Sequence, residues 1–129
     1  LPWRVEGHLK LEGARGCGVF VGADLKHSVG LTLLRFGEAV CVAVDIPVSD
    51  LTGERRAKEL MEPVSTGGVD FAMSANGTIV EIEVNGVLFA TRTLDSAPKQ
   101  LALFVDAPSE SDKARFSCLT LRRGSFQAP

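Results

Sequence analysis

The stretch VEIEVNGVLFATRTL, residues 80–94, decides which fold class the sequence predicts. Apolar and polar residues alternate on both sides of Asn85-Gly86, and this period of two is typical of half-buried β-strands. Asn-Gly favours a two-residue hairpin turn of type I′, because both residues tolerate the positive φ that the turn requires. The stretch therefore predicts a β-hairpin. One face of its first strand is directed to the core, with Val80, Ile82 and Val84.

A second Asn-Gly pair, Asn76-Gly77, extends this hairpin into a predicted three-stranded meander over residues 69–94. Alternating segments separated by turn residues recur along the rest of the chain, as in sandwiches and barrels. We predict an all-β fold, an antiparallel two-sheet β-sandwich (jelly roll) of about nine strands. The other strands are expected at 3–13, 16–22, 28–37, 39–46, 101–107 and 114–124. The expected core includes Val80, Ile82, Val84, Phe89, Leu101, Leu103 and Phe116.

One segment, residues 48–68, interrupts the alternation. Good helix formers lie between Thr52 and Met61, and Pro63 follows as a stop signal. The composition is compatible with a short helix or with a charged loop near residues 50–63, and the sequence leaves both open. In either case the segment is an insertion between strands and not a domain.

The bulk properties predict one domain over residues 1–129. The formal net charge is −2 and no large block of one sign occurs, which argues against a nucleic-acid partner. The longest apolar runs are far shorter than the roughly 18–20 residues that a membrane-spanning helix needs, so no membrane insertion is expected. The chain begins at Leu1 without an initiator Met or targeting motif, which predicts a mature product or a module excised from a longer chain.

Glu81 and Glu83 are the first candidates for catalysis. Residues i and i+2 of a strand share a face about 6.5–7 Å apart, and a retaining glycosidase holds its two carboxylates about 5–5.5 Å apart. Laminarinase-type β-glucanases carry E-x-D-x-E on a strand, but Asn85 occupies the third acidic position here. Simple hairpin pairing sets Glu81 opposite Ala90 and places Arg92 diagonally from Glu81. We therefore predict two surface glutamates and no catalytic residue.

Other candidate sites are weaker. His8 and His27 have no acidic or nucleophilic partner that the sequence can identify, so surface positions are expected. The only candidate calcium loop, residues 106–112 with Asp106, Glu110 and Asp112, has few ligands. The sequence therefore predicts no metal and no cofactor.

The three cysteines, Cys17, Cys41 and Cys118, lie singly in apolar segments without metal-binding spacing. They are expected to be small buried hydrophobic residues. One disulfide with one free thiol is the alternative if the protein is exported.

The late strands resemble the C-terminal half of concanavalin A-like lectin/glucanase jelly rolls, especially laminin-G-like and 3-keto-disaccharide-hydrolase-type modules. The matching positions are Asn85-Gly86, Leu101–Val105 and Phe116–Arg122, within about the last 55 residues. The resemblance implies a lectin-like accessory domain that binds carbohydrate or a protein partner. The sequence leaves the location unknown, with export or the cell envelope favoured. No catalytic acid of the family has a counterpart here.

Three function hypotheses remain. The favoured one is a non-catalytic binding or interaction module of a larger protein, with carbohydrate as a candidate ligand. The alternatives are a glycoside-hydrolase-like enzyme using Glu81, Glu83 or Asp106, and a structural domain packed on a neighbouring domain. The binding residues are unknown at this stage, because Trp3 is phased with the core and the remaining aromatic residues are seven Phe.

Overall fold

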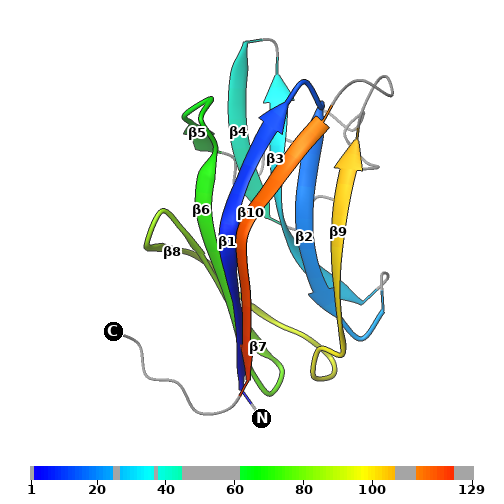
Figure 1. Ribbon diagram of the computed structural model, residues 1–129. Coiled ribbons are helices and arrows are strands. Elements are labelled where there is room, and N and C mark those ends of the chain that lie inside the picture. The colour runs from blue at the N-terminus through cyan, green and yellow to red at the C-terminus, as the bar shows by residue number, and fades with distance from the viewer. Residues whose placement is uncertain (1, 25–26, 37, 45–61, 107–112, 124–129) are drawn as a thin grey trace.

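The computed structural model describes residues 2–24, 27–36, 38–44, 62–106 and 113–123. The described residues form ten β-strands and no helix (Figure 1). Their bounds are β1 (Trp3–Glu12), β2 (Gly16–Gly22), β3 (Ser28–Phe36), β4 (Ala39–Val44), β5 (Glu62–Val64), β6 (Val69–Asn76), β7 (Ile79–Val84), β8 (Val87–Thr93), β9 (Gln100–Asp106) and β10 (Lys113–Arg123).

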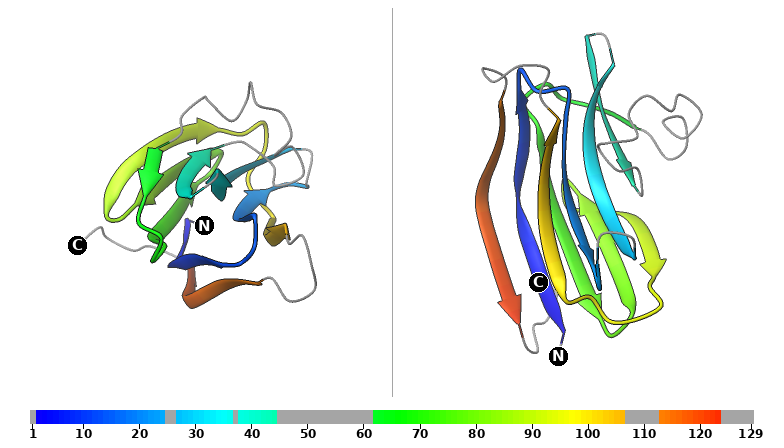
Figure 2. Two further views of the ribbon diagram at one scale, coloured as in Figure 1. Left: turned by 90° about the horizontal axis from the view of Figure 1, so that it is seen from above. Right: turned by 90° about the vertical axis from the view of Figure 1, so that its right-hand side faces the viewer.

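The strands form two antiparallel five-stranded sheets that pack face to face (Figure 2). Sheet A has the order β10-β1-β6-β7-β8, and sheet B has the order β5-β4-β3-β2-β9. The predicted all-β sandwich is confirmed. Within the segment predicted as an insertion, Glu62–Val64 forms the edge strand β5, where Pro63 is tolerated because an edge strand need not donate on its outer side. The helix or loop expected before Glu62 lies outside the described residues.

The core lies between the sheets and is built from the alternate residues of each strand. Val80 and Ile82 are fully buried, and Val84 and Phe89 pack against the core while partly exposed, as predicted. The prediction for Leu101 and Leu103 is wrong, since these side chains are 41% and 42% exposed. The side chain of Phe116 lies outside the described part of the chain.

The physical reason for the two exposed leucines is their place at the edge of the sandwich. Leu101 pairs with Val21 and Leu103 pairs with Val19, and paired residues share a face of the sheet. Both leucines therefore face the interior side, as the alternation predicts. However, β9 is the last strand of sheet B, and an edge strand is covered only if the opposite sheet extends over it.

The hairpin turn at Asn85-Gly86 is confirmed. Val84 pairs with Val87, and φ is +52° at Asn85 and +82° at Gly86, as type I′ requires. Asn85 has a second role that the sequence did not reveal. Its side-chain Oδ1 accepts a hydrogen bond from the backbone N–H of Asp70, and its own N–H donates to the Asp70 carbonyl.

The predicted turn at Asn76-Gly77 is displaced by one residue. Asn76 pairs with Ile79 as the last residue of β6, so the two loop residues are Gly77 and Thr78. Only Gly77 has positive φ, +61°, which matches a type II′ turn with glycine first. Asn76 thus belongs to the strand, where it needs no unusual conformation.

Replacing Gly86 by valine is expected to lower the free energy of unfolding by about 1–2 kcal/mol, because positive φ is unfavourable for a residue with a Cβ. Space is not the cause, since a Cβ at Gly86 would meet no atom within 4 Å. Urea denaturation measures the change. Gly67→Ala is the control, because Gly67 lies outside the positive-φ region and is expected to have little effect. A Gly86→Val variant as stable as the parent would contradict the turn assignment.

Candidate functional site

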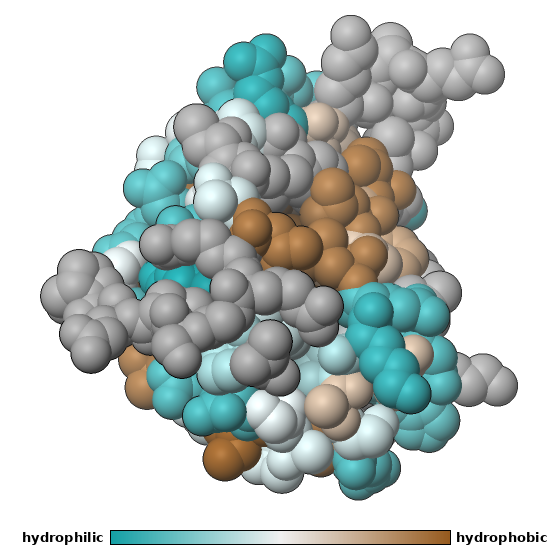
Figure 3. All heavy atoms as spheres, turned by 60° about the horizontal axis from the view of Figure 1, so that its bottom comes forward, coloured by the Kyte–Doolittle hydropathy of each residue, from teal (hydrophilic) through white to brown (hydrophobic). Residues whose placement is uncertain are grey.

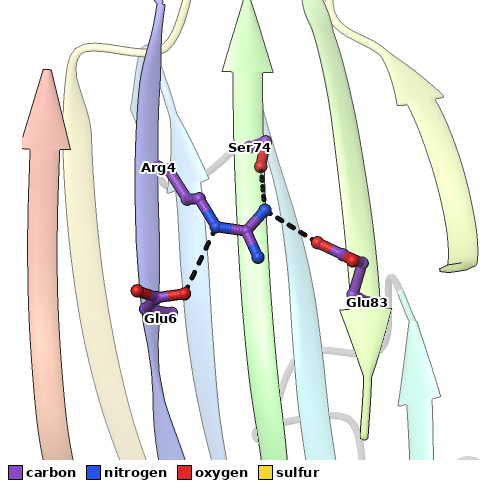
Figure 4. Close-up of polar contacts among 4 residues, drawn as sticks. All are labelled: Arg4, Glu6, Ser74 and Glu83. Atoms are coloured by element: carbon purple, nitrogen blue, oxygen red, sulfur yellow. Dashed lines mark hydrogen bonds and ion pairs between the residues drawn. The ribbon is translucent and has the colours of Figure 1, made fainter. Parts of the chain in front are cut away.

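The outer face of sheet A carries a cluster of four polar side chains, Arg4, Glu6, Ser74 and Glu83, called here the polar cluster (Figure 4). Strand alternation produces it. Trp3 and Val5 of β1 are buried in the core, so the intervening Arg4 points to the opposite face. The same alternation on β6 and β7 directs Ser74 and Glu83 to that face, and sheet order brings the three strands together.

Arg4 is the centre of the polar cluster. Its Nη1 donates to Oε2 of Glu83 at 2.7 Å and to Oγ of Ser74 at 2.9 Å. Its Nε donates to Oε2 of Glu6 at 3.3 Å. The side chains of Arg4 and Glu83 are 20% and 28% exposed, so the ion pair is partly shielded from water but reachable from outside. Burial lowers the pKa of Arg4, but the hydrogen bonds and charges of Glu83 and Glu6 outweigh it and leave the pKa raised.

The structure gives Glu81 and Glu83, which share the outer face of β7, different contacts. The β7–β8 pairing shifts by one residue between Ile82 and Glu83, so Glu81 lies opposite Thr91 and the predicted pairing with Ala90 is wrong. A β-bulge causes this shift in register, because it sets two residues of one strand against a single residue of the partner strand. Glu83 does pair with Leu88, as expected. Glu81 is exposed, whereas Glu83 is held by Arg4 from a strand 79 positions away in sequence.

A shallow hollow of about 450 Å³ adjoins the polar cluster. It lies where the pairing of β1 with β10 is irregular, between Glu6 and His8. Glu6 belongs to both the polar cluster and the hollow, so the two form one continuous surface. The residues lining the hollow are Glu6, Gly7, His8, Asp70, Phe71, Ser117 and Thr120.

His8 links the hollow to the turn that precedes β6. Its Nδ1 lies 2.8 Å from Oδ1 of Asp70, and its Nε2 lies 3.0 Å from the carbonyl oxygen of Gly67. Because both ring nitrogens face acceptors, only the protonated imidazolium donates to both. The hydrogen bond to Asp70 is the main cause of a raised pKa for His8, followed by the Gly67 carbonyl. His27, by contrast, contacts Asp24 of its own turn, with Nδ1 2.9 Å from Oδ1.

This arrangement predicts that the contribution of His8 to stability depends on pH. A raised folded-state pKa stabilises the fold below the unfolded pKa of about 6.5, and the contribution is lost as pH rises through the folded value. The difference in free energy of unfolding between the parent and His8→Asn should therefore be largest at acidic pH. It should become smaller above neutrality. Denaturant titrations of both proteins across this range measure it. A pH-independent difference would contradict the prediction.

The cysteines behave as buried apolar residues where the structure describes them. Cys17 and Cys41 are buried and free, so the alternative of one disulfide among the three is wrong. Burial raises the pKa of the Cys17 thiol to about 12, which keeps it protonated and unreactive. The side chain of Cys118 lies outside the described residues.

Within the described ranges, no group of three or more His, Cys, Asp and Glu side chains could hold a metal ion. Glu110, Asp112 and the side chain of Asp106, the remaining candidates for calcium or catalysis, lie outside those ranges. The described residues also contain no helix with the length and apolar character needed to cross a membrane.

Comparison with known proteins identifies the fold. No family model matches the sequence, and no curated protein matches it. Solved structures do match. A galectin of Caenorhabditis elegans has a TM-score of 0.56 at 12% identity, with 94% of this chain and 82% of the galectin covered. The chain has the concanavalin A-like jelly-roll fold.

Two other structures extend this finding. The carbohydrate-binding module CBM66 of Bacillus subtilis has a TM-score of 0.54 at 12% identity, covering 95% of this chain and 75% of the module. The PL7 alginate lyase AlyA1 of Zobellia galactanivorans has a TM-score of 0.59 at 9% identity and 94% coverage of this chain. The chain spans only 61% of that lyase. At these identities the likeness concerns the fold, and function has to be argued from the site.

Proposed function

We propose that this chain is a non-catalytic carbohydrate-binding module whose ligand contacts the polar cluster on the outer face of sheet A. The observation that carries the proposal is the fixed position of Arg4, held by Glu83, Ser74 and Glu6. The fold adds support, since a galectin and a carbohydrate-binding module share it. That the ligand is a carbohydrate, and that the chain is a module of a larger protein, are also parts of this proposal.

The chemistry of the polar cluster suits sugar hydroxyl groups, each of which both donates and accepts hydrogen bonds. Carboxylates of Glu6 and Glu83 accept, and the guanidinium of Arg4 donates. Within the described part of the chain, the contacts of Arg4 use Nε and Nη1, which leaves Nη2 for a ligand. Because strands hold these groups in place before binding, little side-chain ordering is needed when the ligand arrives.

The adjoining hollow gives a second sugar ring a place to lie. Ser117 and Thr120 contribute hydroxyl groups at its β10 side, and Asp70 contributes a carboxylate at its β6 side. A ligand of two or more rings would therefore contact the polar cluster and the hollow together. This continuity favours an oligosaccharide over a monosaccharide.

The hydrolase alternative has less support. A catalytic acid of a glycosidase works in an enclosed apolar site that keeps it protonated. Glu81 is exposed on strand β7, and the carboxylate of Glu83 accepts a hydrogen bond from Arg4. The two groups therefore differ in role, with Glu83 positioning the guanidinium. Non-catalytic binding is compatible with an exposed Glu81 and with a Glu83 that is bonded to Arg4, because it does not require a protonated carboxyl group.

A glycan array followed by calorimetry on the best ligand tests the proposal. Replacing Arg4 by methionine keeps the apolar stem but removes the donors, and we expect at least tenfold weaker binding, as for other lost hydrogen bonds to charged groups. Arg115→Met is the matched control, because Arg115 pairs with Glu12 on the same sheet outside the polar cluster and is expected to leave Kd unchanged.

Two results would overturn the proposal. One is the absence of any glycan ligand. The other is equal Kd for Arg4→Met and the parent, with folding verified by the melting temperature of each variant. Sugar release from a glycan by the parent, abolished in Glu83→Gln, would establish the hydrolase alternative instead.

A further inference from the structure

The edge strands β9 and β10 lie on the same side of the sandwich and belong to different sheets (Figure 2). Side chains that face the interior are exposed there, and we call this surface the open seam. Leu101, Leu103 and Val105 of β9 pair with Val21, Val19 and Cys17, which belong to the core. On β10, Leu121 pairs with the buried Val5. The four seam side chains are 41%, 42%, 49% and 61% exposed, in the order Leu101, Leu103, Val105, Leu121.

This exposure is unfavourable in the isolated domain. Each Å² of apolar surface removed from water contributes about 25 cal/mol, so covering these four side chains would supply a substantial free energy. Contiguous apolar surface of this kind marks binding sites more often than it occurs by chance. Figure 3 shows hydrophobic surface gathered on one part of the molecule, bordered by hydrophilic residues.

A pocket of about 180 Å³ lies at one end of the open seam, lined by Trp3, Pro98, Lys99, Gln100, Leu101 and Leu121. Its walls are largely apolar, and Lys99 is the single charged residue among them. The backbone N–H of Lys99 donates to the carbonyl of Gly22 at 2.9 Å, which ties this segment to the end of β2. The pocket wall thus combines largely apolar residues with one lysine, whose backbone is tied to the end of β2.

We propose that the open seam binds an amphipathic carboxylate, with its head group at Lys99 and its alkyl chain along β9. The charge of Lys99 complements a carboxylate. From the pocket, Leu101, Leu103 and Val105 continue on one face of β9 over about 13 Å, four residues at the strand rise. A straight apolar track of this length fits an extended alkyl chain better than a compact ligand. This site is separate from the polar cluster, which lies on the outer face of sheet A.

Trp3 makes the proposal directly measurable. It is the only tryptophan and the chain has no tyrosine, so the intrinsic fluorescence comes from the pocket wall. Titration with dodecanoate, kept below its micelle concentration, should change the emission of Trp3 in a saturable way. Lys99→Gln should weaken binding about fivefold, as expected for a partly exposed ion pair. Dodecanol, with the same chain and no charge, should bind the parent about as weakly as dodecanoate binds Lys99→Gln.

Three further variants separate this site from other surfaces. Leu103→Asn should weaken binding of dodecanoate, because it places an amide in the apolar track, and Lys10→Gln should leave binding unchanged as a matched lysine control. Arg4→Met should also leave it unchanged, so failure of the glycan proposal would not affect this one. The proposal is overturned if dodecanoate does not change Trp3 emission, or if dodecanol binds as well as dodecanoate. A dimer in sedimentation that Leu103→Asn converts to monomer would also overturn it, by showing a second copy on the open seam.

Discussion

Replacing Ile82 by alanine is expected to lower the free energy of unfolding by about 2–5 kcal/mol. Ile82 is fully buried in the middle of β7, with Met73 of β6 and Ala90 of β8 as its cross-strand partners. Deleting three carbons there removes apolar contacts and leaves a cavity that neighbouring strands cannot close, because the sheet pairing holds them in place. The size of the loss depends on how far Met73 moves into the space, since methionine is the most adaptable core residue.

Ile79→Ala provides the matched control for this prediction. Ile79 begins the same strand and carries the same side chain, but is 48% exposed. Its truncation should cost less than about 1 kcal/mol. Urea denaturation of both variants measures the difference. Equal losses would show that β7 does not direct Ile82 into the core, and the sandwich register would be wrong.

The two hairpins of the meander illustrate what could be predicted from sequence. The turn at Asn85-Gly86 is encoded locally, because backbone conformation alone selects these two residues. The predicted position of the turn at Gly77 is wrong by one residue. An Asn-Gly pair can supply both loop residues of a hairpin, or, as here, the last strand residue and the first loop residue. Local chemistry therefore identified both hairpins but located only one of them correctly.

The candidate sites depend on contacts that no local pattern encodes. Arg4 and Glu83 meet only because β1 inserts between β10 and β6, a non-local pairing that sequence alternation does not determine. Alternation likewise directed Leu101 and Leu103 to the interior face correctly. It could not show that the sandwich is open at that edge. The sheet face that a side chain occupies is determined locally, by its position in the strand. Its burial depends on whether the opposite sheet covers that position.

The second large effect concerns Phe20, which lies on the outer face of sheet B opposite Gly30. A Cβ built on Gly30 would overlap ring carbons Cδ1 and Cε1 of Phe20, so the ring occupies the space that a side chain would fill. Phe20 also meets Phe104 of β9 edge-to-face, with ring centroids 5.0 Å apart. Gly30 and Phe20 thus pack as one unit. The aromatic ring covers a glycine that has no side chain to pack and would by itself weaken the strand.

We expect Phe20→Ala to cost about 3–5 kcal/mol, because the ring is only 6% exposed and its loss also removes the contact with Phe104. Gly30→Val should cost about 1–3 kcal/mol, since the new side chain forces the ring out of its place. In the Phe20→Ala background the same valine meets no ring. There it should be neutral or stabilising, because β-branched residues favour strands.

A double-mutant cycle measured by urea denaturation therefore should give a coupling free energy of about 0.5–3 kcal/mol, the range for residues in contact. Leu34→Ala paired with Gly30→Val is the control cycle. Leu34 is buried on the same strand but pairs with Gly16 and Cys41, so its coupling with position 30 should be near zero. Additive losses in the Phe20–Gly30 cycle would mean that the ring does not lie over Gly30.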